Sequence, residues 1–508
     1  MQKSMVLLGL ILLVSGNLIA QSPAEKKLPE FQVQQSEVEA MLRFLASDEL
    51  KGRRAGSEGN NIAARYIASH LEAYGFEPGA GEGGYFQPVP LALTKPAAAS
   101  RLEADESAFV FNEDYIIMSG AAADLNTTAV FAGHGWVDES KKLDDYKGLD
   151  VAGKVVFVLS GIPDDNDRRA AFNAMPVKQK MAKEKGAAAL IEIYTLNFPW
   201  NFFTRYFGGE RIGLVSEEDA AADQTMVYGW MKNIVKDELF SRMKEGKTVK
   251  VRLTSSGVTR EDMPSNNVIG VLEGTDPVLK NEYILLSAHF DHVGVGRQGG
   301  GSFTAQDSIF NGARDNAMGT VALLTAARAL ARERPKRSVI VLAVTAEEIG
   351  LLGSSHYADH PLFPLEKTIF NLNTDGGGYN DTGHISVAGF GRTGTDQAIE
   401  TAAAAAGLGV IADPAPEQGL FDRSDNVSFA KKGIPALTFS PGFTGFDEEI
   451  RKYYHQVTDE ADAVDMAYLL KYCQAYAHLA RLIADETSRP QWKAGDKYEE
   501  AGKELYGK

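Results

Sequence analysis

The chain has 508 residues, 44% of them hydrophobic and 24% charged, with a single cysteine and a formal net charge of −16. This length predicts two or three globular domains. The acidity argues against a nucleic-acid partner, because no basic face is left to neutralise phosphates. It equally disfavours binding to an anionic membrane surface. Since Cys473 has no partner, an intrachain disulfide is excluded.

Residues 1–20 have the pattern of a secretory signal peptide. They carry Lys3, an apolar core over 5–14 and small residues before Gln21. Such a segment is too short to span a bilayer and is removed on export. A retained membrane anchor is the alternative. We expect a periplasmic or secreted bacterial protein with no membrane attachment after cleavage.

The N-terminal part of the mature chain predicts two amphipathic helices, over 36–45 and up to about Tyr74. Between them, Arg53 and Arg54 lie in a glycine-rich turn, where a solvated loop is favoured over an anion site. From about residue 105 the chain shows short β-rich runs separated by turns. This predicts a compact α/β or β-rich domain without clustered ligands, inserted into or set before the sheet that carries the chemistry.

Three apolar runs downstream end abruptly in acidic residues or histidine. Tyr283–His289 is followed by Asp291, Ser338–Val344 by Glu347 and Glu348, and 368–373 by Asp375. Each run has the length of a buried strand. Open α/β sheets keep their ligand crevices at the strand ends, so these side chains are expected to meet there.

Two further segments add candidate ligands. The turn-like stretch 311–319 contains Asp315 and leads into a predicted helix, and His455 lies far downstream. Histidines and carboxylates without cysteine suit Zn²⁺, Mn²⁺ or Co²⁺. One aspartate can bridge two metal ions about 3.5–4 Å apart.

Glu347 and Glu348 are adjacent and can divide two roles between them. Successive residues at a strand end point in different directions, so one can bind metal while the other faces the substrate as a general base. A solvated charge pair is the alternative. This alternative is disfavoured because the two glutamates end an apolar run that is expected to be buried. Two adjacent charges that both face solvent are not expected at such a position.

Five motifs together resemble the co-catalytic dizinc peptidases that include bacterial leucyl aminopeptidase and glutamate carboxypeptidase. They are HFD at 289–291, GARDNAMG at 312–319, TAEEIGLLGS at 345–354, NTDGGG at 373–378 and HQVTD at 455–459. The resemblance implies an α/β fold with a mixed, mostly parallel sheet flanked by helices, of the zinc-exopeptidase, phosphorylase/hydrolase-like type. The β-rich segment is similar to the protease-associated (PA) domain that some members carry as an insertion.

These expectations divide the chain into successive parts. In order they are a signal peptide at 1–20, the N-terminal part of the peptidase domain at 21–105, the PA insert at 106–258, the peptidase domain with the dizinc site at 259–487, and a charged tail at 488–508, which is either a peripheral helix or frayed.

The resemblance also implies roles for single residues. His289 and Asp375 would hold one zinc ion, Glu348 and His455 the other, and Asp315 would bridge them. Glu347 would be the general base. Asp291 and Asp459 would be hydrogen-bond partners of the two ligand histidines.

Members of the family often have a cis peptide after the bridging aspartate, which here would be Asp315–Asn316. Members also often have Ser-Asp-His near the substrate, whereas this chain has Asn426 at the third position. That departure puts a substrate-binding role for Asn426 in doubt. Four histidines have no place in the pattern and are expected at the surface or in loops: His292, His356, His360 and His384.

The sequence therefore predicts a secreted zinc aminopeptidase that hydrolyses N-terminal residues of peptides through a metal-bridging water, with Glu347 as base. A carboxypeptidase or amidohydrolase on the same scaffold is the nearest alternative. A non-catalytic receptor-like protein is more remote, because it predicts missing ligands and none is missing. A two-metal phosphatase or nuclease is opposed by the resemblance and by the acidic chain.

Overall fold

The computed structural model describes residues 31–163, 165, 168–215, 225–413 and 415–507. The predicted signal peptide lies outside these ranges. Every helix within them is too short or too polar to cross a membrane.

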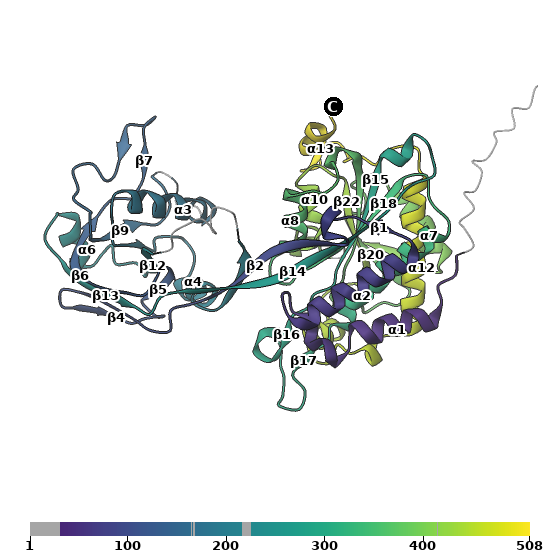
Figure 1. The fold of residues 1–508 in the computed structure, drawn as a ribbon, viewed down its shortest axis with the longest axis horizontal. Helices are drawn as coiled ribbons and strands as arrows, with labels where there is room; N and C mark the ends of the chain where they lie inside the picture. The colour runs from purple at the N-terminus through teal and green to yellow at the C-terminus, as the bar shows by residue number, and fades with distance from the viewer. Residues whose placement is uncertain (1–30, 164, 166–167, 216–224, 414, 508) are drawn as a thin grey trace, which may run out of the picture. The chain divides into compact units, whose positions relative to one another are not determined.

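The main sheet is mixed, with a parallel centre and antiparallel flanks (Figure 1). Strands β18, β15, β19 and β22 pair in parallel. Antiparallel pairs join β14 to β18 and β20 to β22, so the sheet is mixed as predicted but less uniformly parallel than expected. Its strands in spatial order are β11 (Arg211–Leu214), β2 (Phe86–Lys95), β14 (Thr259–Leu272), β18 (Ser338–Val344), β15 (Tyr283–His289), β19 (Thr368–Thr374), β22 (Ala436–Pro441), β20 (His384–Ala388) and β21 (Gly409–Ala412), with β1 (Glu77–Pro78) paired to β14.

The central strands are buried along almost their whole length. All residues of β18 and β19 are buried, as is expected of parallel strands covered on both faces. Because the parallel strands run in one direction, their carboxyl ends meet at one edge of the sheet. The apolar runs recognised in the sequence therefore end side by side.

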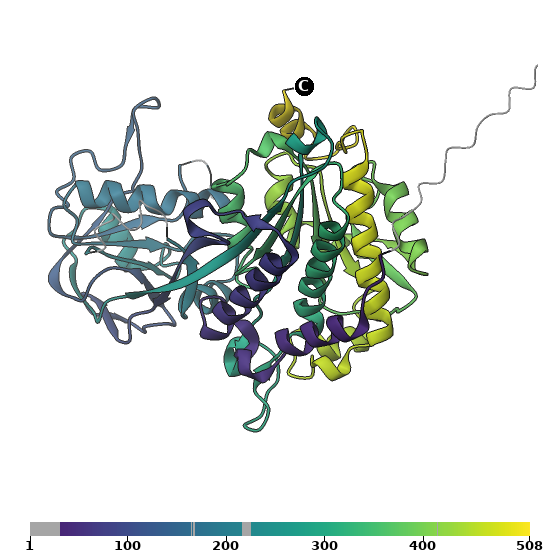
Figure 2. The ribbon, with the colours of Figure 1, turned by 45° about the vertical axis from the view of Figure 1, so that its right-hand side comes forward.

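Helices cover both faces of this sheet (Figures 1 and 2). Leu285, Ile340 and Leu342 pack with Tyr357 of α8 and Phe429 of α10. Alternate residues of the strands face the other way, toward α7 and α12. The helices are α1 (Gln35–Leu45), α2 (Glu58–Tyr74), α7 (Met318–Arg332), α8 (Leu352–Asp359), α9 (Asp396–Ala405), α10 (Asn426–Ala430), α11 (Glu448–Tyr453), α12 (Met466–Asp485) and α13 (Glu499–Tyr506).

The C-terminal tail is anchored rather than frayed. Trp492 donates from Nε1 to the carbonyl of Gly433, and the Tyr506 hydroxyl donates to the carbonyl of Thr368, where β19 begins.

The β-rich segment forms a second sheet with its own hydrophobic cores on both faces. Its assignment as a PA domain, with bounds 106–258, stays a prediction. Strand β11 falls within those bounds but pairs with β2 in the main sheet. The second sheet runs in the order β4 (Ser107–Phe109), β3 (Ser100–Ala104), β13 (Lys250–Ser255), β6 (Ala123–Phe131), β9 (Val155–Leu159), β10 (Ala189–Ile193), β12 (Val227–Met231) and β5 (Tyr115–Ser119), with helices α3 (Arg168–Glu184), α4 (Trp200–Phe207) and α6 (Glu238–Lys244).

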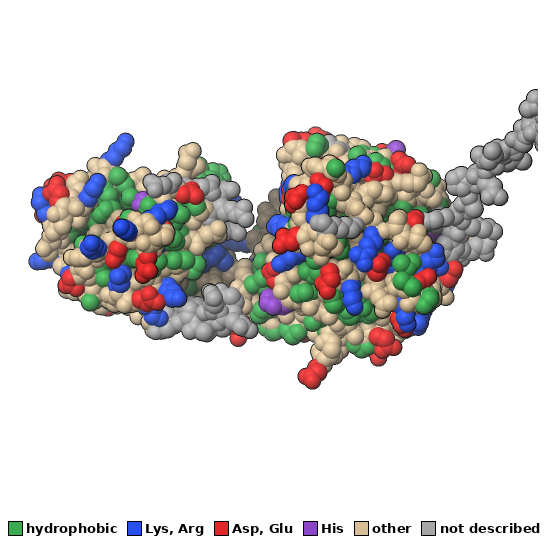
Figure 3. Space-filling view, turned by 90° about the horizontal axis from the view of Figure 1, so that it is seen from above, with side chains coloured by type: hydrophobic (Ala, Val, Ile, Leu, Met, Phe, Trp, Pro, Cys, Tyr) green, Lys and Arg blue, Asp and Glu red, His purple; other side chains and the backbone are tan. Residues whose placement is uncertain are grey.

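On one face of the molecule the charged side chains are mixed rather than sorted by sign (Figure 3). On the face drawn in Figure 3, lysines and arginines alternate with aspartates and glutamates. The described residues of this face therefore form no large patch of one sign (Figure 3).

Candidate metal centre

The predicted ligands come from the ends of the central strands and from the turns that follow them. His289 is the last residue of β15, and Asp375 follows β19 directly. Glu347 and Glu348 lie in the turn after β18, and Asp315 lies in the turn that precedes α7. His455 follows α11. Segments far apart in the sequence therefore meet at one edge of the sheet.

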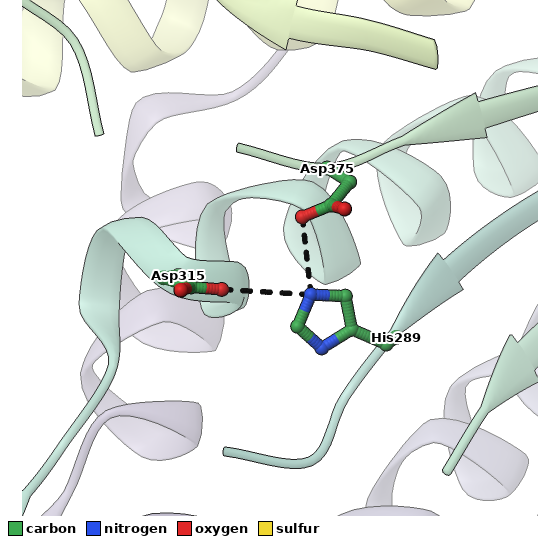
Figure 4. A group of neighbouring side chains, drawn as sticks. All are labelled: His289, Asp315 and Asp375. Carbon is green, nitrogen blue, oxygen red and sulfur yellow. Dashed lines mark hydrogen bonds and ion pairs between the residues drawn. The ribbon is translucent and has the colours of Figure 1, made fainter. Parts of the chain in front are cut away.

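Asp315 lies between two histidines and offers one carboxylate oxygen to each. Its Oδ1 lies 3.5 Å from His289 Nε2, and its Oδ2 lies 3.3 Å from His455 Nε2. His289 Nε2 is also 3.1 Å from Asp375 Oδ1, and Figure 4 shows both carboxylates aimed at this nitrogen. His455 Nε2 is 3.0 Å from Glu348 Oε2. Asp315 thus has the position of a ligand shared between two sites.

The donor set fits divalent metal ions. Ligand atoms of His289, Asp315 and Asp375 lie within 4.8 Å of one another, and so do those of His292, Asp315 and Glu348. Within the described part of the chain, these carboxylates pair with histidines and not with lysine or arginine. Buried carboxylates this close repel one another unless a cation lies among them. Imidazole nitrogen and carboxylate oxygen together suit zinc.

The electrostatic field of the site favours positive charge. Burial by itself would lower the pKa of His289, but the carboxylates of Asp375 and Glu347 outweigh it and hold that pKa well above its usual value. Burial likewise opposes protonation of His455, yet hydrogen bonds with Asp315 and Glu348 raise its pKa to about 10. The negative charge that raises the pKa of both imidazoles also favours the binding of a metal cation between them.

Glu347 lines the same cavity but belongs to neither ligand group found among the described residues. Burial raises its pKa well above the usual value, and the charges of Asp375 and Glu348 add to this effect although His289 opposes it. The residue before it, Ala346, has a φ of 61°, a left-handed conformation that is unusual without glycine. Such backbone conformations are concentrated at functional sites.

Asp291 holds the turn that carries the two glutamates. Its Oδ1 accepts a hydrogen bond from the Glu347 N–H at 3.1 Å, and its Oδ2 accepts one from the Glu348 N–H at 3.4 Å. His289 Nδ1 lies 3.2 Å from the Asp291 carbonyl oxygen but 3.8 Å from its carboxylate. His289 was expected to contact the Asp291 carboxylate, but it contacts the Asp291 backbone carbonyl instead. The carboxylate points toward the turn after β18, where it accepts hydrogen bonds from Glu347 and Glu348. Burial raises the pKa of Asp291 to about 7.

Asp459 supports Asp315 and not the histidine that the sequence suggested. Its carboxylate accepts hydrogen bonds from the Arg314 N–H at 2.9 and 3.0 Å and from the Asp315 N–H at 3.2 Å. The Asp459 carboxylate is therefore bound by the backbone turn before α7. The expectation that it is the hydrogen-bond partner of His455 is corrected. The Asp315–Asn316 peptide bond is cis, as expected.

The Ser424–Asp425–Asn426 segment reaches the ligand Asp375 through Ser424. Ser424 donates from Oγ to Asp375 Oδ2 at 2.5 Å. Asn426 is fully buried and bonds to Thr438 and to the carbonyl of Phe421, so it serves packing, in agreement with the doubt about its substrate role.

His292 lies in the loop after β15, as expected, but it is buried and not at the surface. Its exposure is 1%, and its Nδ1 lies 2.6 Å from Glu348 Oε1. His356, His360 and His384 are partly or fully exposed, as expected.

Arg53 also departs from expectation, because its guanidinium is buried and not solvated. It donates hydrogen bonds to the backbone carbonyls of Leu45, Phe290, Asn311 and Gly312. Burial lowers its pKa to about 10, while nearby carboxylates oppose that effect. The side chain therefore ties an N-terminal turn to the segments that carry His289 and Asp315.

A cavity of about 140 Å³ opens beside the ligands. Its floor includes His289, Asp315 and Glu347, and the phenol of Tyr454 and the exposed side chain of Arg423 also line it. Burial raises the pKa of Tyr454, with a further contribution from Asp315 and Glu348, so the phenol keeps its proton. The sequence pattern gave no signal for either lining residue. The apolar wall consists of Ala388, Leu420, Phe443, Phe446 and Ile450.

Comparison with known proteins places this geometry in a family. Residues 267–480, which carry every predicted ligand, match the model described as Peptidase family M28. This segment belongs to peptidase family M28. The M28 segment contains the central strands of the main sheet and the cavity beside them.

Curated relatives match this chain over part of their length. A vacuolar membrane protease of Saccharomyces cerevisiae is 39% identical over 114 residues, which cover 22% of this chain and 10% of that protein. Aminopeptidase YwaD of Bacillus subtilis is 27% identical over 203 residues, which cover 39% of this chain and 40% of the relative. The chain thus spans less than half the length of these relatives.

Among solved structures, the aminopeptidase from Aneurinibacillus sp. strain AM-1 is similar with a TM-score of 0.51 and 19% identity, covering 92% of this chain and 97% of that one. At this identity the similarity concerns the fold, and it confirms the mixed α/β architecture.

Proposed function

We propose that this protein is a secreted dizinc exopeptidase, an aminopeptidase that removes N-terminal residues from peptides. The observation that carries the proposal is Asp315, whose two oxygens face His289 and His455 beside a cavity that also contains Glu347. The M28 segment and the aminopeptidase relative support it.

In this proposal His289 and Asp375 hold one zinc ion, and Glu348 and His455 hold the other, with Asp315 common to both. Bound zinc supplies a Lewis acid that polarises the scissile carbonyl and lowers the pKa of water. Asp291 and Asp459 fix the backbone turns that present these ligands.

Glu347 moves the proton. Its carboxylate takes a proton from the attacking water and delivers it to the nitrogen of the leaving amine. The raised pKa suits the second step, because a carboxyl group that holds its proton can pass it to the amine. Tyr454 keeps its phenolic proton and can donate it in a hydrogen bond to the oxygen that gains charge.

The apolar wall of the cavity favours a substrate with an apolar side chain next to the cleaved bond. Phe443, Phe446 and Ile450 offer aromatic and aliphatic surface to such a side chain. Leucyl and phenylalanyl substrates are therefore expected to be cleaved faster than aspartyl ones.

A second candidate, a carboxypeptidase on the same metal site, is favoured by one observation. Arg423 places a cation at the cavity, and a guanidinium can bind a terminal carboxylate with two hydrogen bonds. In that case the substrate would enter with its C-terminus and not its N-terminus next to the metal site.

The test combines metal content with hydrolysis of free and N-blocked peptides by the wild type, Glu347→Gln and the surface control Glu366→Gln. The aminopeptidase proposal predicts about two zinc ions per chain and cleavage only of free N-termini. It also predicts at least a roughly 100-fold loss of kcat in Glu347→Gln with zinc retained. Cleavage of N-blocked peptides from the C-terminus would favour the carboxypeptidase. A wild type without bound metal or turnover would overturn both.

Two features outside the site complete the proposal. The N-terminal segment is proposed to export the protein to the periplasm or the medium. The β-rich segment is proposed to be a PA domain, which would take part in substrate access or partner contact.

A further inference from the structure

Glu348 lies between two imidazole rings, and each of its carboxylate oxygens contacts one of them. Oε2 is 3.0 Å from His455 Nε2, while Oε1 is 2.6 Å from His292 Nδ1. The two rings are 5.6 Å apart at an angle of 79°. His292 stands outside the ligand set that the family resemblance implies, so its contact with a ligand needs its own explanation.

The His292 ring is held in a fixed place. Its side chain is fully buried, and its backbone N–H donates to the carbonyl of Arg53 at 3.3 Å. A Cβ atom on Gly312 would lie 2.5 Å from the ring carbon Cδ2, so only glycine leaves room for the imidazole there. A buried ring packed this closely cannot turn away from Glu348 without moving the backbone.

The direction of the hydrogen bond follows from the chemistry of the pair. A carboxylate oxygen accepts hydrogen bonds, so the N–H on His292 Nδ1 is the donor. Hydrogen bonds to a charged acceptor in a buried site are short and strong. The bond occupies Oε1 and leaves Oε2 as the oxygen that faces His455.

The spacing distinguishes this contact from a pair of ligands on one ion. Two ligand atoms about 2.0–2.1 Å from a tetrahedral zinc ion lie roughly 3.3 Å apart. The contacts of Asp315, Asp375 and Glu348 with His289 and His455 range from 3.0 to 3.5 Å and fit that spacing. The 2.6 Å contact between His292 and Glu348 fits a hydrogen bond.

We propose that His292 is a positioning residue that makes Glu348 a one-oxygen metal ligand. The proposal rests on the proposed dizinc function. By holding Oε1, His292 leaves Oε2 facing His455, so Glu348 would offer one oxygen to the ion that it would hold with His455 and Asp315.

The experiment compares His292→Ala and His292→Asn with the wild type, and uses His356→Ala as the control at a histidine outside the cavity. Asparagine is the conservative variant because its Nδ2 can donate a hydrogen bond from nearly the position of the imidazole Nδ1. Zinc affinity is measured by competition with a chelator, and the coordination of each site is followed by the visible absorption of the Co²⁺-substituted protein.

If the proposal holds, His292→Ala still binds two ions at saturation, but one of them binds 10- to 100-fold more weakly, as is typical when the hydrogen-bond partner of a ligand is lost. The Co²⁺ spectrum of that site changes, because Glu348 is free to use both oxygens. His292→Asn restores the affinity to within about threefold, and His356→Ala resembles the wild type.

Three results would overturn it. One is unchanged affinity and spectrum in His292→Ala. Another is a variant that binds a single ion even at saturation, which would make His292 a ligand itself. The third is a failure of asparagine to restore what alanine loses. If His292→Ala does not fold, His292→Asn alone decides between the two roles. A positioning role predicts two bound ions in His292→Asn, and a role as ligand predicts the loss of one ion. A wild type that binds no zinc would instead overturn the proposed function on which this inference rests.

Discussion

Ser424 donates a hydrogen bond from Oγ to Asp375 Oδ2 at 2.5 Å, on the oxygen that does not face His289. Asn373 in turn donates from Nδ2 to Ser424 Oγ at 2.8 Å. This chain of donors fixes the Asp375 carboxylate from behind and turns Oδ1 toward the imidazole. Burial would raise the pKa of Asp375, but His289 and the hydrogen bond from Ser424 hold it below its usual value.

Ser424→Ala is expected to lower zinc affinity about tenfold, because the ligand loses the partner that orients it. The free energy of unfolding should fall by only about 1 kcal/mol. Chelator competition and thermal unfolding measure the two effects. Ser428→Ala, a buried serine that bonds to Ser354, serves as control and should leave affinity unchanged. Equal affinities in all three proteins would contradict the prediction.

Arg53→Met is expected to destabilise the fold severely. The guanidinium serves buried carbonyls from separate segments, and each one left without a donor costs about 1–3 kcal/mol. We expect a loss of at least about 3 kcal/mol in urea unfolding. Arg54→Met, at the partly exposed neighbour, should cost less than about 1 kcal/mol. A loss of unfolding free energy in Arg53→Met as small as that in Arg54→Met would contradict the prediction. It would indicate that water replaces the guanidinium as the hydrogen-bond donor to these carbonyls.

Tyr454→Phe is expected to lower kcat about 100-fold while KM stays within about threefold. The phenol would act where charge develops in the transition state, and loss of one such donor typically costs this much. Zinc content should remain that of the wild type. Steady-state kinetics with a leucyl substrate provide the measurement. Tyr453→Phe, whose side chain does not line the cavity, controls for loss of a nearby hydroxyl.

Glu460→Gln is expected to stabilise the metal-free protein above pH 7 but not at pH 4.5. Burial, with the charges of Asp48 and Asp307, raises the pKa of Glu460 to about 7 from an ordinary 4.5. Between these values the folded state binds more protons than the unfolded state, so stability falls as pH rises. After allowance for solvent screening, the gain in the variant is about 1 kcal/mol at pH 8. Denaturant unfolding at both pH values checks it, with Glu417→Gln as control.

The sequence predicted the positions that depend on strand periodicity. His289 and Asp375 end apolar runs of the length of buried strands, and parallel strands bring such ends together. Asp315 and His455 lie in turns, where no periodicity places a side chain, so the sequence pattern marked them only as candidate ligands and the family resemblance gave them roles. The resemblance thus supplied the division of the ligands between two ions, which the local pattern does not indicate.

The contacts that the sequence did not predict depend on packing between distant segments. His292 lies in the loop after β15, but its ring is buried and packs closely against Gly312. The sequence pattern does not indicate this burial. Arg53 is buried because it meets carbonyls such as that of Asn311, 258 residues away. Asp291 and Asp459 were recognised as important, yet their partners are backbone N–H groups whose position depends on the local turn.

The arrangement of the ligands along the chain has a consequence for assembly of the protein. His289 and Asp375 are separated by 86 residues, and Asp459 reaches Arg314 across 145. Closing loops of this length costs chain entropy, and such non-local contacts form late in folding. The two proposed ion sites share Asp315, so a proteolytic cut that frees the segment carrying it would remove a ligand from both. In the proposed dizinc enzyme, such a cut would lower the zinc bound per chain even where the remaining strands stay folded.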